Sequence, residues 1–226
     1  MSRPRICVVV TASNVDEAVE TIRMLQPQSP DMIEIRLDHM ASIGDIEQIR
    51  VSTELPLIAT NRSRDQGGHW KGSERERLTP LIEASAVGFD YIDLELSTAS
   101  IRETGDTVRD EGAKMIVSHH DFERSLSISE LDEVMRKELK LGAGICKIVG
   151  TAHTKRDSLD YLAFLDSYRE REIVSFGMGE AGMLSRILSP LFGGAFTYAS
   201  SETGRESAPG QLTLATMREI YGLLGV

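Results

Sequence analysis

One lysine lies within an apolar run typical of a β-strand, Gly144-Ile-Cys-Lys147-Ile-Val-Gly150. A lysine in such a run either extends its ammonium group to solvent or is held inside the protein. Held inside beside other cations, for which Arg36, Arg62 and Arg186 are the candidates, it is expected to lose its proton readily. A neutral amine attacks carbonyl carbons and forms a Schiff base. Lys147 is therefore the candidate covalent nucleophile.

Two adjacent histidines, in the segment Ser118-His119-His120-Asp-Phe122, are candidate proton carriers. Neighbouring strand residues point to opposite faces, so at most one of the two faces the interior of a barrel or sheet. Histidine gains and loses a proton near neutral pH, although a hydrogen-bonded histidine without a chemical role is the alternative. The other histidines are scattered, and no Cys/His cluster has metal-ligand spacing, so we predict no metal site.

Charged side chains alternate with apolar ones in four candidate strands. In the second of them, Ile33, Ile35 and Leu37 share one face and charged residues share the other. The polar members of the four strands are Glu34, Arg36, Asp38, Thr60, Arg62, Asp93, Glu95 and Lys147. The simple alternative is that these charged residues lie at strand ends exposed to water. The same pattern in four strands makes this alternative less favoured. Because buried charges are costly unless paired, we expect these groups to satisfy one another and a polar ligand.

Short strands that alternate with amphipathic helices must position these residues. The predicted strands are Ile6–Thr11, Met32–Leu37, Leu57–Arg62, Tyr91–Leu96, Lys114–His120, Ile145–Thr151, Ile173–Gly177 and Ala195–Ser200. Apolar residues at helical spacing predict helices over Val15–Leu25, Leu126–Leu141 and Leu159–Tyr168. Ser73 and Glu76 predict a capping box, and Gly88 and Gly112 predict helix ends.

Eight strand–helix units in 226 residues favour a single α/β domain over residues 1–226, folded as a (β/α)8 TIM barrel. An open doubly wound sheet is the alternative. Active sites of such barrels form at the carboxyl ends of the strands, where most of the charged residues above lie. The Gly- and Ser-rich segment 200–210 follows the last strand, and we expect it either to close over a ligand or to be a plain surface loop.

Composition limits the class of protein. A net charge of −10 and 41% hydrophobic residues predict a globular protein without a basic nucleic-acid-binding surface. No apolar run is long enough to cross a membrane, and the first residues do not resemble a signal peptide. Cys7 and Cys146 lie in apolar runs and are expected to be buried thiols. We therefore expect a soluble protein in the cytoplasm.

Six segments in a specific order carry a family resemblance. They are Glu34-Ile-Arg36-Leu-Asp38, Thr60-Asn-Arg62 with Gly67-Gly68, Ser118-His-His120-Asp-Phe122, Lys147-Ile-Val, Ser175-Phe-Gly-Met-Gly179 through Ser185-Arg186, and Ser207-Ala-Pro-Gly-Gln211. Together they resemble the type I 3-dehydroquinate dehydratases of the shikimate pathway, over nearly the whole chain. The resemblance implies a (β/α)8 barrel lyase, a homodimer, a small-molecule substrate and neither a metal nor an organic cofactor.

The resemblance also implies a role for each site residue. Lys147 would form an imine with the C3 ketone of 3-dehydroquinate, and His120 would act as general base and acid in a syn loss of water. Arg186 would bind the substrate carboxylate. Glu34, Arg36, Arg62 and Gln211 would hold substrate hydroxyl groups, with Ser207 on the closing loop. Asp93 is a candidate to orient His120.

Two positions depart from the family, and a third is loosely aligned. Gln66 stands where a Glu usually precedes the Gly-Gly pair, and Asp65 is a candidate substitute for it. His119 replaces the usual Asn or Tyr and is the weaker candidate base. Thr11 is a candidate for a first-strand substrate contact. The alternative functions are a class I aldolase-like Schiff-base barrel and a non-catalytic ligand-binding barrel.

Overall fold

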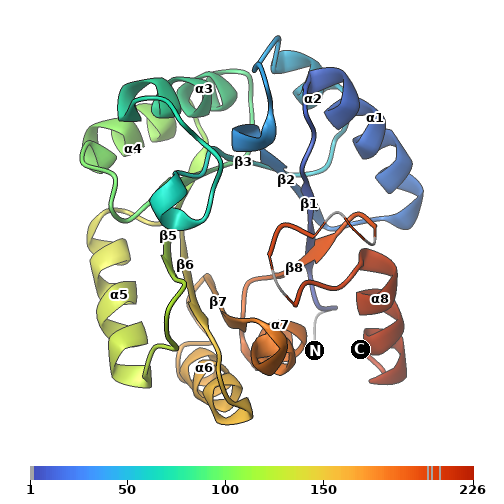
Figure 1. Cartoon of the computed structure of the whole chain (residues 1–226), viewed down its shortest axis with the longest axis vertical. Helices are drawn as coiled ribbons and strands as arrows, with labels where there is room; N and C mark the ends of the chain where they lie inside the picture. Colours follow the sequence, from blue (N-terminus) through green and yellow to red (C-terminus); the bar gives the residue numbers. More distant parts are fainter. Residues whose placement is uncertain (1–2, 203, 205, 209) are drawn as a thin grey trace.

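Eight parallel strands form the centre of the protein (Figure 1). The computed structural model describes residues 3–202, 204, 206–208 and 210–226. Among these residues the strands are β1 (Ile6–Val10), β2 (Met32–Arg36), β3 (Leu57–Thr60), β4 (Tyr91–Glu95), β5 (Lys114–Asp121), β6 (Ile145–Thr151), β7 (Ile173–Met178) and β8 (Thr197–Ser200). All eight predicted strands are confirmed, with some ends shifted by one or two residues.

The strand order shows a barrel rather than an open sheet. The strands follow one another as β7-β6-β5-β4-β3-β2-β1-β8, and β1 pairs in parallel with both β2 and β8. Just before β8, the backbone N–H of Ala195 donates to the carbonyl oxygen of Ile173 on β7 at 2.7 Å. A doubly wound sheet would reverse its order near the middle. The predicted single-domain (β/α)8 barrel, nearly closed, is therefore confirmed.

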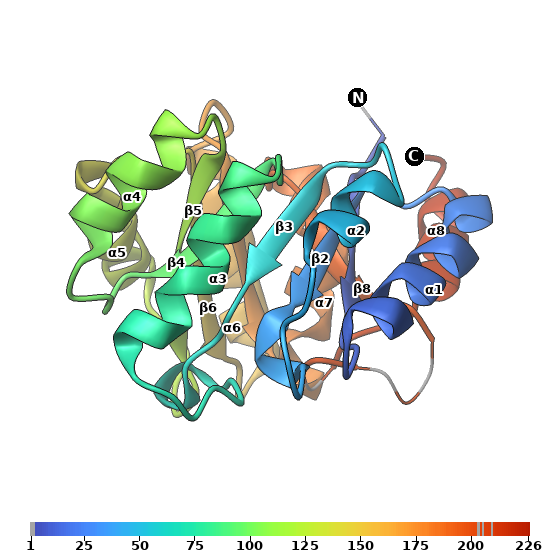
Figure 2. The same cartoon turned by 90° about the horizontal axis from the view of Figure 1, so that it is seen from above.

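Helices surround the barrel on its outside (Figure 2). They are α1 (Val15–Leu25), α2 (Glu47–Val51), α3 (Glu74–Ala86), α4 (Ile101–Asp110), α5 (Ile128–Lys140), α6 (Lys155–Ser167), α7 (Met183–Leu188) and α8 (Leu214–Leu223). Short 3-10 turns are η1 (Gln26–Gln28), η2 (Leu37–His39), η3 (Arg64–Gln66), η4 (Glu180–Gly182) and η5 (Ser189–Phe192). Within the described residues, none of these helices is long and apolar enough to span a bilayer.

Local sequence signals set the helix ends. Ser73 and Glu76 form the predicted capping box of α3, in which each side chain bonds the other's backbone N–H. Gly88 and Gly112 follow α3 and α4 with φ of +92° and +89°, a backbone conformation that favours glycine at a helix end. The helices over 15–25, 126–141 and 159–168 are also confirmed, with the last beginning at Lys155.

Strand residues divide between two apolar regions. Ile33, Ile35 and Leu37 face outward and belong to a core shared with the helices, as the alternation predicts. The inward residues near the amino ends of the strands form a second core, which includes Cys7, Met32, Ile58, Ile116, Ile145 and Val174. Further along the same inward faces the residues become charged. The barrel is therefore sealed by apolar side chains at one end and lined by polar ones at the other.

Candidate active site

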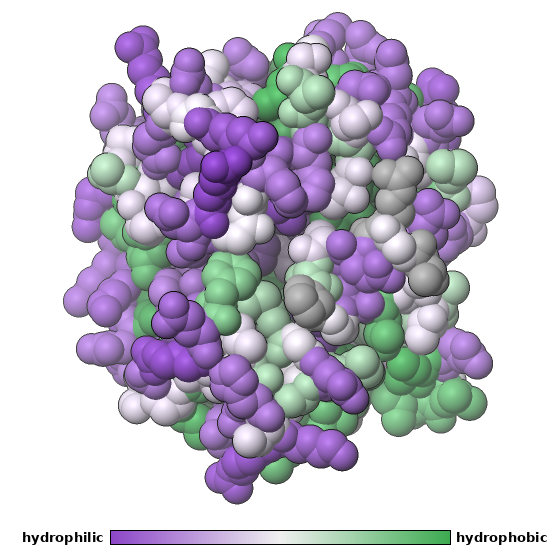
Figure 3. Space-filling model, in the orientation of Figure 1, coloured by the Kyte–Doolittle hydropathy of each residue, from purple (hydrophilic) through white to green (hydrophobic). Residues whose placement is uncertain are grey.

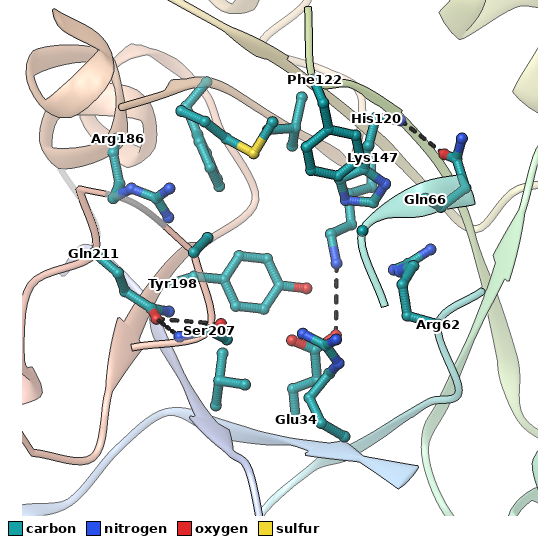
Figure 4. Close-up of a pocket in the computed structure, with 17 residues that line it drawn as sticks. Glu34, Arg62, Gln66, His120, Phe122, Lys147, Arg186, Tyr198, Ser207 and Gln211 are labelled. Atoms are coloured by element: carbon teal, nitrogen blue, oxygen red, sulfur yellow. Dashed lines mark hydrogen bonds and ion pairs between the residues drawn. The ribbon is translucent and has the colours of Figure 1, made fainter. Parts of the chain in front are cut away.

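A pocket opens at the carboxyl ends of the strands (Figure 4). All eight site residues predicted from the sequence line it: Glu34, Arg36, Arg62, His120, Lys147, Arg186, Ser207 and Gln211. They come from β2, β5, β6, α7, the turn after β3 and the segment after β8. The space-filling view shows this face hollowed near the centre, with hydrophilic residues around much of its rim (Figure 3).

Lys147 is held inside the barrel and does not extend to solvent. Only 5% of the residue is exposed. Its Nζ donates to Asp93 Oδ2 at 3.0 Å and lies 3.5 Å from Glu34 Oε1. The nearest charged groups are thus carboxylates, although Arg62, one of the cations predicted to lie nearby, binds the same Asp93 oxygen.

Asp93 organises the floor of the pocket. Its Oδ2 also accepts a hydrogen bond from Arg62 Nη2 at 2.7 Å, and its Oδ1 accepts one from Ser118 Oγ at 2.6 Å. Burial raises the pKa of Asp93, but the Arg62 and Lys147 charges outweigh burial and hold it well below the usual range. Three donors use this carboxylate, and none belongs to His120. Among the described residues no hydrogen bond joins Asp93 to His120, so the structure gives no direct contact for the predicted orienting role.

His120 lies in the pocket as a neutral imidazole. Burial, followed by the positive charges of Arg62 and Lys147, lowers its pKa well below 6.5. Its Nδ1 is buried and has no hydrogen-bond partner among the described residues. The ring stacks on Phe122, with centroids 6.0 Å apart. The neighbouring His119 does not line the pocket.

The turn after β3 brings Gln66 to His120. Gln66 Oε1 accepts a hydrogen bond from the backbone N–H of His120 at 3.1 Å. Gly67 has a φ of +76°, and a Cβ at Gly68 would lie 2.0 Å from the carbonyl oxygen of Arg62. Both positions therefore require glycine. Asp65 is exposed on this turn and does not line the pocket. The prediction that Asp65 takes the place of the family's usual Glu is therefore wrong.

Most of the other charged groups carry their own partners. Arg36 donates from Nε and Nη2 to the two oxygens of Asp38 at 2.8 and 2.7 Å. Glu34 accepts from Thr60 Oγ1 at 2.5 Å. These bonds hold the side chains in fixed positions around the pocket before any ligand binds.

Arg186 is the exception. The residue is 2% exposed, and its Nε and Nη2 have no hydrogen-bond partner in the described part of the chain. Its guanidinium lies over the Phe176 ring, 4.2 Å from the centroid. Burial lowers its pKa to about 10, so it is still a cation at neutral pH. A buried guanidinium without a carboxylate is a binding site for a carboxylate or other anion.

The segment after β8 supplies Ser207 and Gln211. The backbone N–H and Oγ of Ser207 donate to Gln211 Oε1 at 2.7 and 3.1 Å. Pro209, part of the motif that carries the resemblance, lies outside the described residues. Thr11 does not line the pocket, whereas Val9 does, so the predicted first-strand contact at Thr11 is wrong.

Several lining residues were missed by the reasoning from sequence. They include Phe122, Val149, Phe176, Met178 and Tyr198. Alternation along β7 puts Val174, Phe176 and Met178 on one face, so the sequence carried a signal for the two that line the pocket, Phe176 and Met178. Tyr198 pairs in register with Cys7, whose side chain points inward.

Two histidines that are distant in sequence meet at the rim. The ring centroids of His39 and His69 are 4.3 Å apart, and Asp38 Oδ2 lies 3.7 Å from His69 Nδ1. This oxygen already accepts bonds from Arg36 and from the backbone N–H of His69. Because those bonds use both lone pairs of the oxygen, Asp38 serves as the partner of Arg36 rather than as a ready metal ligand.

Fold and pocket thus define a (β/α)8 barrel with a buried lysine, a neutral histidine and an arginine at the carboxyl ends of its strands. Among the described residues, Nε and Nη2 of this arginine have no hydrogen-bond partner. The profile of the type I 3-dehydroquinase family matches residues 6–226. The chain is 37% identical over 221 residues to a 3-dehydroquinate dehydratase of Dehalococcoides mccartyi, covering 98% of this chain and 96% of that protein. It is 36% identical over 222 residues to one of Methanococcus maripaludis, covering 97% and 100%.

Solved structures agree with these relatives. The type I 3-dehydroquinate dehydratase of Clostridium difficile superposes with a TM-score of 0.89 at 27% identity, covering 99% of this chain and 93% of that one. The enzyme of Geobacillus kaustophilus superposes with a TM-score of 0.87 at 26% identity, covering 99% and 92%. The chain therefore belongs to the type I 3-dehydroquinase family.

Proposed function

We propose that the protein is a hydro-lyase that converts 3-dehydroquinate into 3-dehydroshikimate in the shikimate pathway. Family membership over nearly the whole chain supports this activity. The single observation that carries it in the structure is the buried Arg186, whose Nε and Nη2 lack a partner among the described residues, in one pocket with Lys147. A substrate with a carboxylate and a ketone supplies an anion for the Arg186 guanidinium and a carbonyl carbon for the Lys147 amine.

Lys147 begins the reaction. His120 takes the proton of the ammonium group, and the amine attacks the C3 ketone carbon to give a carbinolamine, which loses water to form an iminium. The Clostridium difficile relative was solved with a covalently modified comenic acid, which supports a covalent step in this reaction. The iminium withdraws electrons and makes the C2 proton acidic.

His120 carries the protons. Because burial and nearby cations keep the imidazole neutral, it is a base at physiological pH. It removes the C2 proton and then gives a proton to the departing C1 hydroxyl, which leaves as water. One side chain performs both transfers, so the two groups leave from the same face of the ring. Hydrolysis of the imine then releases the product and Lys147.

The remaining residues hold the substrate. Arg186 pairs with the carboxylate through its free guanidinium edge. Glu34, Arg36, Arg62 and Gln211 hold the ring hydroxyls, and Ser207 closes over the ligand from the segment after β8. The polar groups lie on both sides of Lys147 in Figure 4, which leaves the ring of the substrate between them.

The assay for this function follows the conjugated enone of 3-dehydroshikimate in the ultraviolet. Purified protein mixed with 3-dehydroquinate should produce this absorbance without added metal or cofactor. Binding of 3-dehydroquinate without turnover would instead indicate a non-catalytic barrel. Turnover of a phosphorylated ketose would indicate an aldolase-like enzyme.

We further propose a cytoplasmic homodimer. Leu223 and Leu224, at the end of α8, are 83% and 51% exposed and offer apolar surface for a second copy. The cytoplasm is where a biosynthetic enzyme of this family would meet its substrate. Light scattering after size exclusion should give twice the 25.0 kDa mass of the chain. A mass of one chain would contradict the dimer.

A further inference from the structure

Tyr198 places a hydroxyl group inside the pocket. The residue is 3% exposed, and its ring packs edge-on against Phe196 and Phe176, with centroids 5.3 and 6.3 Å away. In Figure 4 the ring crosses the pocket from β8 and its hydroxyl points toward Lys147 and Glu34. Two aromatic neighbours thus hold the hydroxyl at the reacting end of the pocket.

This hydroxyl has no hydrogen-bond partner among the described residues. A buried hydroxyl is unfavourable unless it is bonded, and buried polar groups in folded proteins almost always are. The other orphaned polar atoms of the pocket are on His120 and Arg186, both of which the proposed function assigns to the substrate. The position of the Tyr198 hydroxyl is therefore explained if a bound substrate supplies its acceptor.

The acceptor must be an atom close to Lys147. Lys147 Nζ lies over the Tyr198 ring, 4.5 Å from its centroid. A carbon bonded to this nitrogen, and the oxygen on that carbon, therefore lie next to the ring. Burial, followed by the charge of Glu34, raises the pKa of Tyr198 well above 10, so the hydroxyl keeps its proton and acts as a donor.

We propose that Tyr198 is a catalytic residue whose hydroxyl donates a hydrogen bond to the C3 oxygen of the substrate during imine formation and hydrolysis. The inference rests on the proposed function. As the C3–N bond forms, the π electrons of the C=O bond move to this oxygen, where the Tyr198 hydroxyl stabilises the developing negative charge. His120 delivers to the oxygen the proton it took from Lys147, then moves a second proton from the attached nitrogen to the same oxygen, which leaves as water while the C=N bond forms. Tyr198 transfers no proton itself.

Two variants separate the hydroxyl from the ring. Tyr198→Phe removes the hydroxyl and keeps the ring under Lys147, whereas Tyr198→Leu removes both. Tyr221→Phe is the matched control, because Tyr221 is also buried and its hydroxyl donates to the carbonyl oxygen of Ile187 at 2.7 Å, outside the pocket. Rapid mixing with 3-dehydroquinate and borohydride measures the rate of imine formation, and steady-state assays measure kcat/KM.

We expect Tyr198→Phe to lower the imine rate and kcat/KM about tenfold, the effect of one lost hydrogen bond, and Tyr198→Leu to lower them further. Tyr221→Phe should leave both unchanged. Inhibitors locate the contact: quinate has an oxygen at C3 and 3-deoxyquinate does not. The Tyr198→Phe variant should bind quinate about tenfold more weakly and 3-deoxyquinate equally well.

Native kcat/KM in Tyr198→Phe overturns the inference. Equal weakening of both inhibitors also overturns it, because the hydroxyl would then act elsewhere or only support the fold. In either case the dehydratase function stands if the native protein makes product. If the native protein makes none, the proposed function and this inference both fail.

Discussion

The arginines of the pocket differ in what neutralises them. Arg62 bonds Asp93 and Ser118, and Arg36 bonds Asp38, so each is part of the folded protein whether or not a ligand is bound. Arg186 faces the pocket over Phe176, and no carboxylate pairs with it in the part of the chain that the structure describes. Substitution of Arg186 should therefore weaken substrate binding more than stability, whereas substitution of Arg62 or Arg36 should lower the free energy of unfolding.

At Arg186 we expect a large loss of binding with little loss of stability. Arg186→Gln removes the partner of the substrate carboxylate and should raise KM about 100-fold. It also removes a buried unpaired cation, so the free energy of unfolding should stay the same or rise. Arg62→Gln is the comparison, since it leaves Asp93 with a lost partner and should lower the free energy of unfolding by about 3 kcal/mol. Urea denaturation and steady-state kinetics test both variants. An equal loss of unfolding free energy in Arg186→Gln and Arg62→Gln would contradict the difference between the two arginines.

The pH dependence of the reaction belongs to His120. Its pKa is lowered, so the neutral base persists as the pH falls below 6.5 and is lost only at the lower, folded-state pKa. The acid limb of kcat/KM should therefore lie below pH 6.5. Gln66→Glu puts a carboxylate beside His120, which favours the imidazolium and should move the limb to higher pH. A limb that does not move would show that Gln66 acts only through the backbone of His120.

Among the elements, the turn between β3 and α3 has the strictest geometry. It carries Arg62 and Gln66 into the pocket, and Gly68 passes against the Arg62 carbonyl oxygen. Gly68→Ala should force the turn to shift, lower the free energy of unfolding by about 1–3 kcal/mol and lower kcat/KM. Gly222→Ala, in α8 with nothing within 4 Å of the added carbon, is the control and should be neutral or stabilising. Native activity and stability in Gly68→Ala would contradict this description.

The elements were predictable to different extents. Strand alternation is local, so the inward faces that carry Glu34, Asp93 and Lys147 could be predicted from the sequence. The strand ends could not: alternation continues to Arg62, but the chain leaves the sheet after Thr60 to form η3. Which donors occupy an inward carboxylate depends on three-dimensional distances, so the sequence could not show which side chains bond Asp93.

Over the whole molecule, buried ion pairs couple the fold to pH. Burial raises the pKa of Asp38, but its bonds to Arg36 outweigh this and lower the pKa from 3.8 to about 2. The unfolded chain therefore takes up this proton before the folded one, and stability is present above pH 3.8 and lost as the pH falls toward 2. The loss amounts to about 2 kcal/mol from this group.

Acid unfolding tests this linkage. Asp38→Asn should be less stable than the native protein at neutral pH and should lose less stability between pH 4 and pH 2. Asp110→Asn, at an exposed position at the end of α4, is the control and should keep the native pH dependence. Urea denaturation at several pH values measures both, and an unchanged slope in Asp38→Asn would contradict the assignment.

The most direct test of a Schiff-base dehydratase is capture of the covalent intermediate. The protein is mixed with 3-dehydroquinate, reduced with borohydride, digested and measured by peptide mass. We predict a reduced adduct on Lys147 in the native protein and none in Lys147→Ala. The control variant Lys155→Ala, which replaces an exposed lysine, should still form the adduct on Lys147. Product formation without an adduct, or an adduct on another lysine, would contradict the role of Lys147.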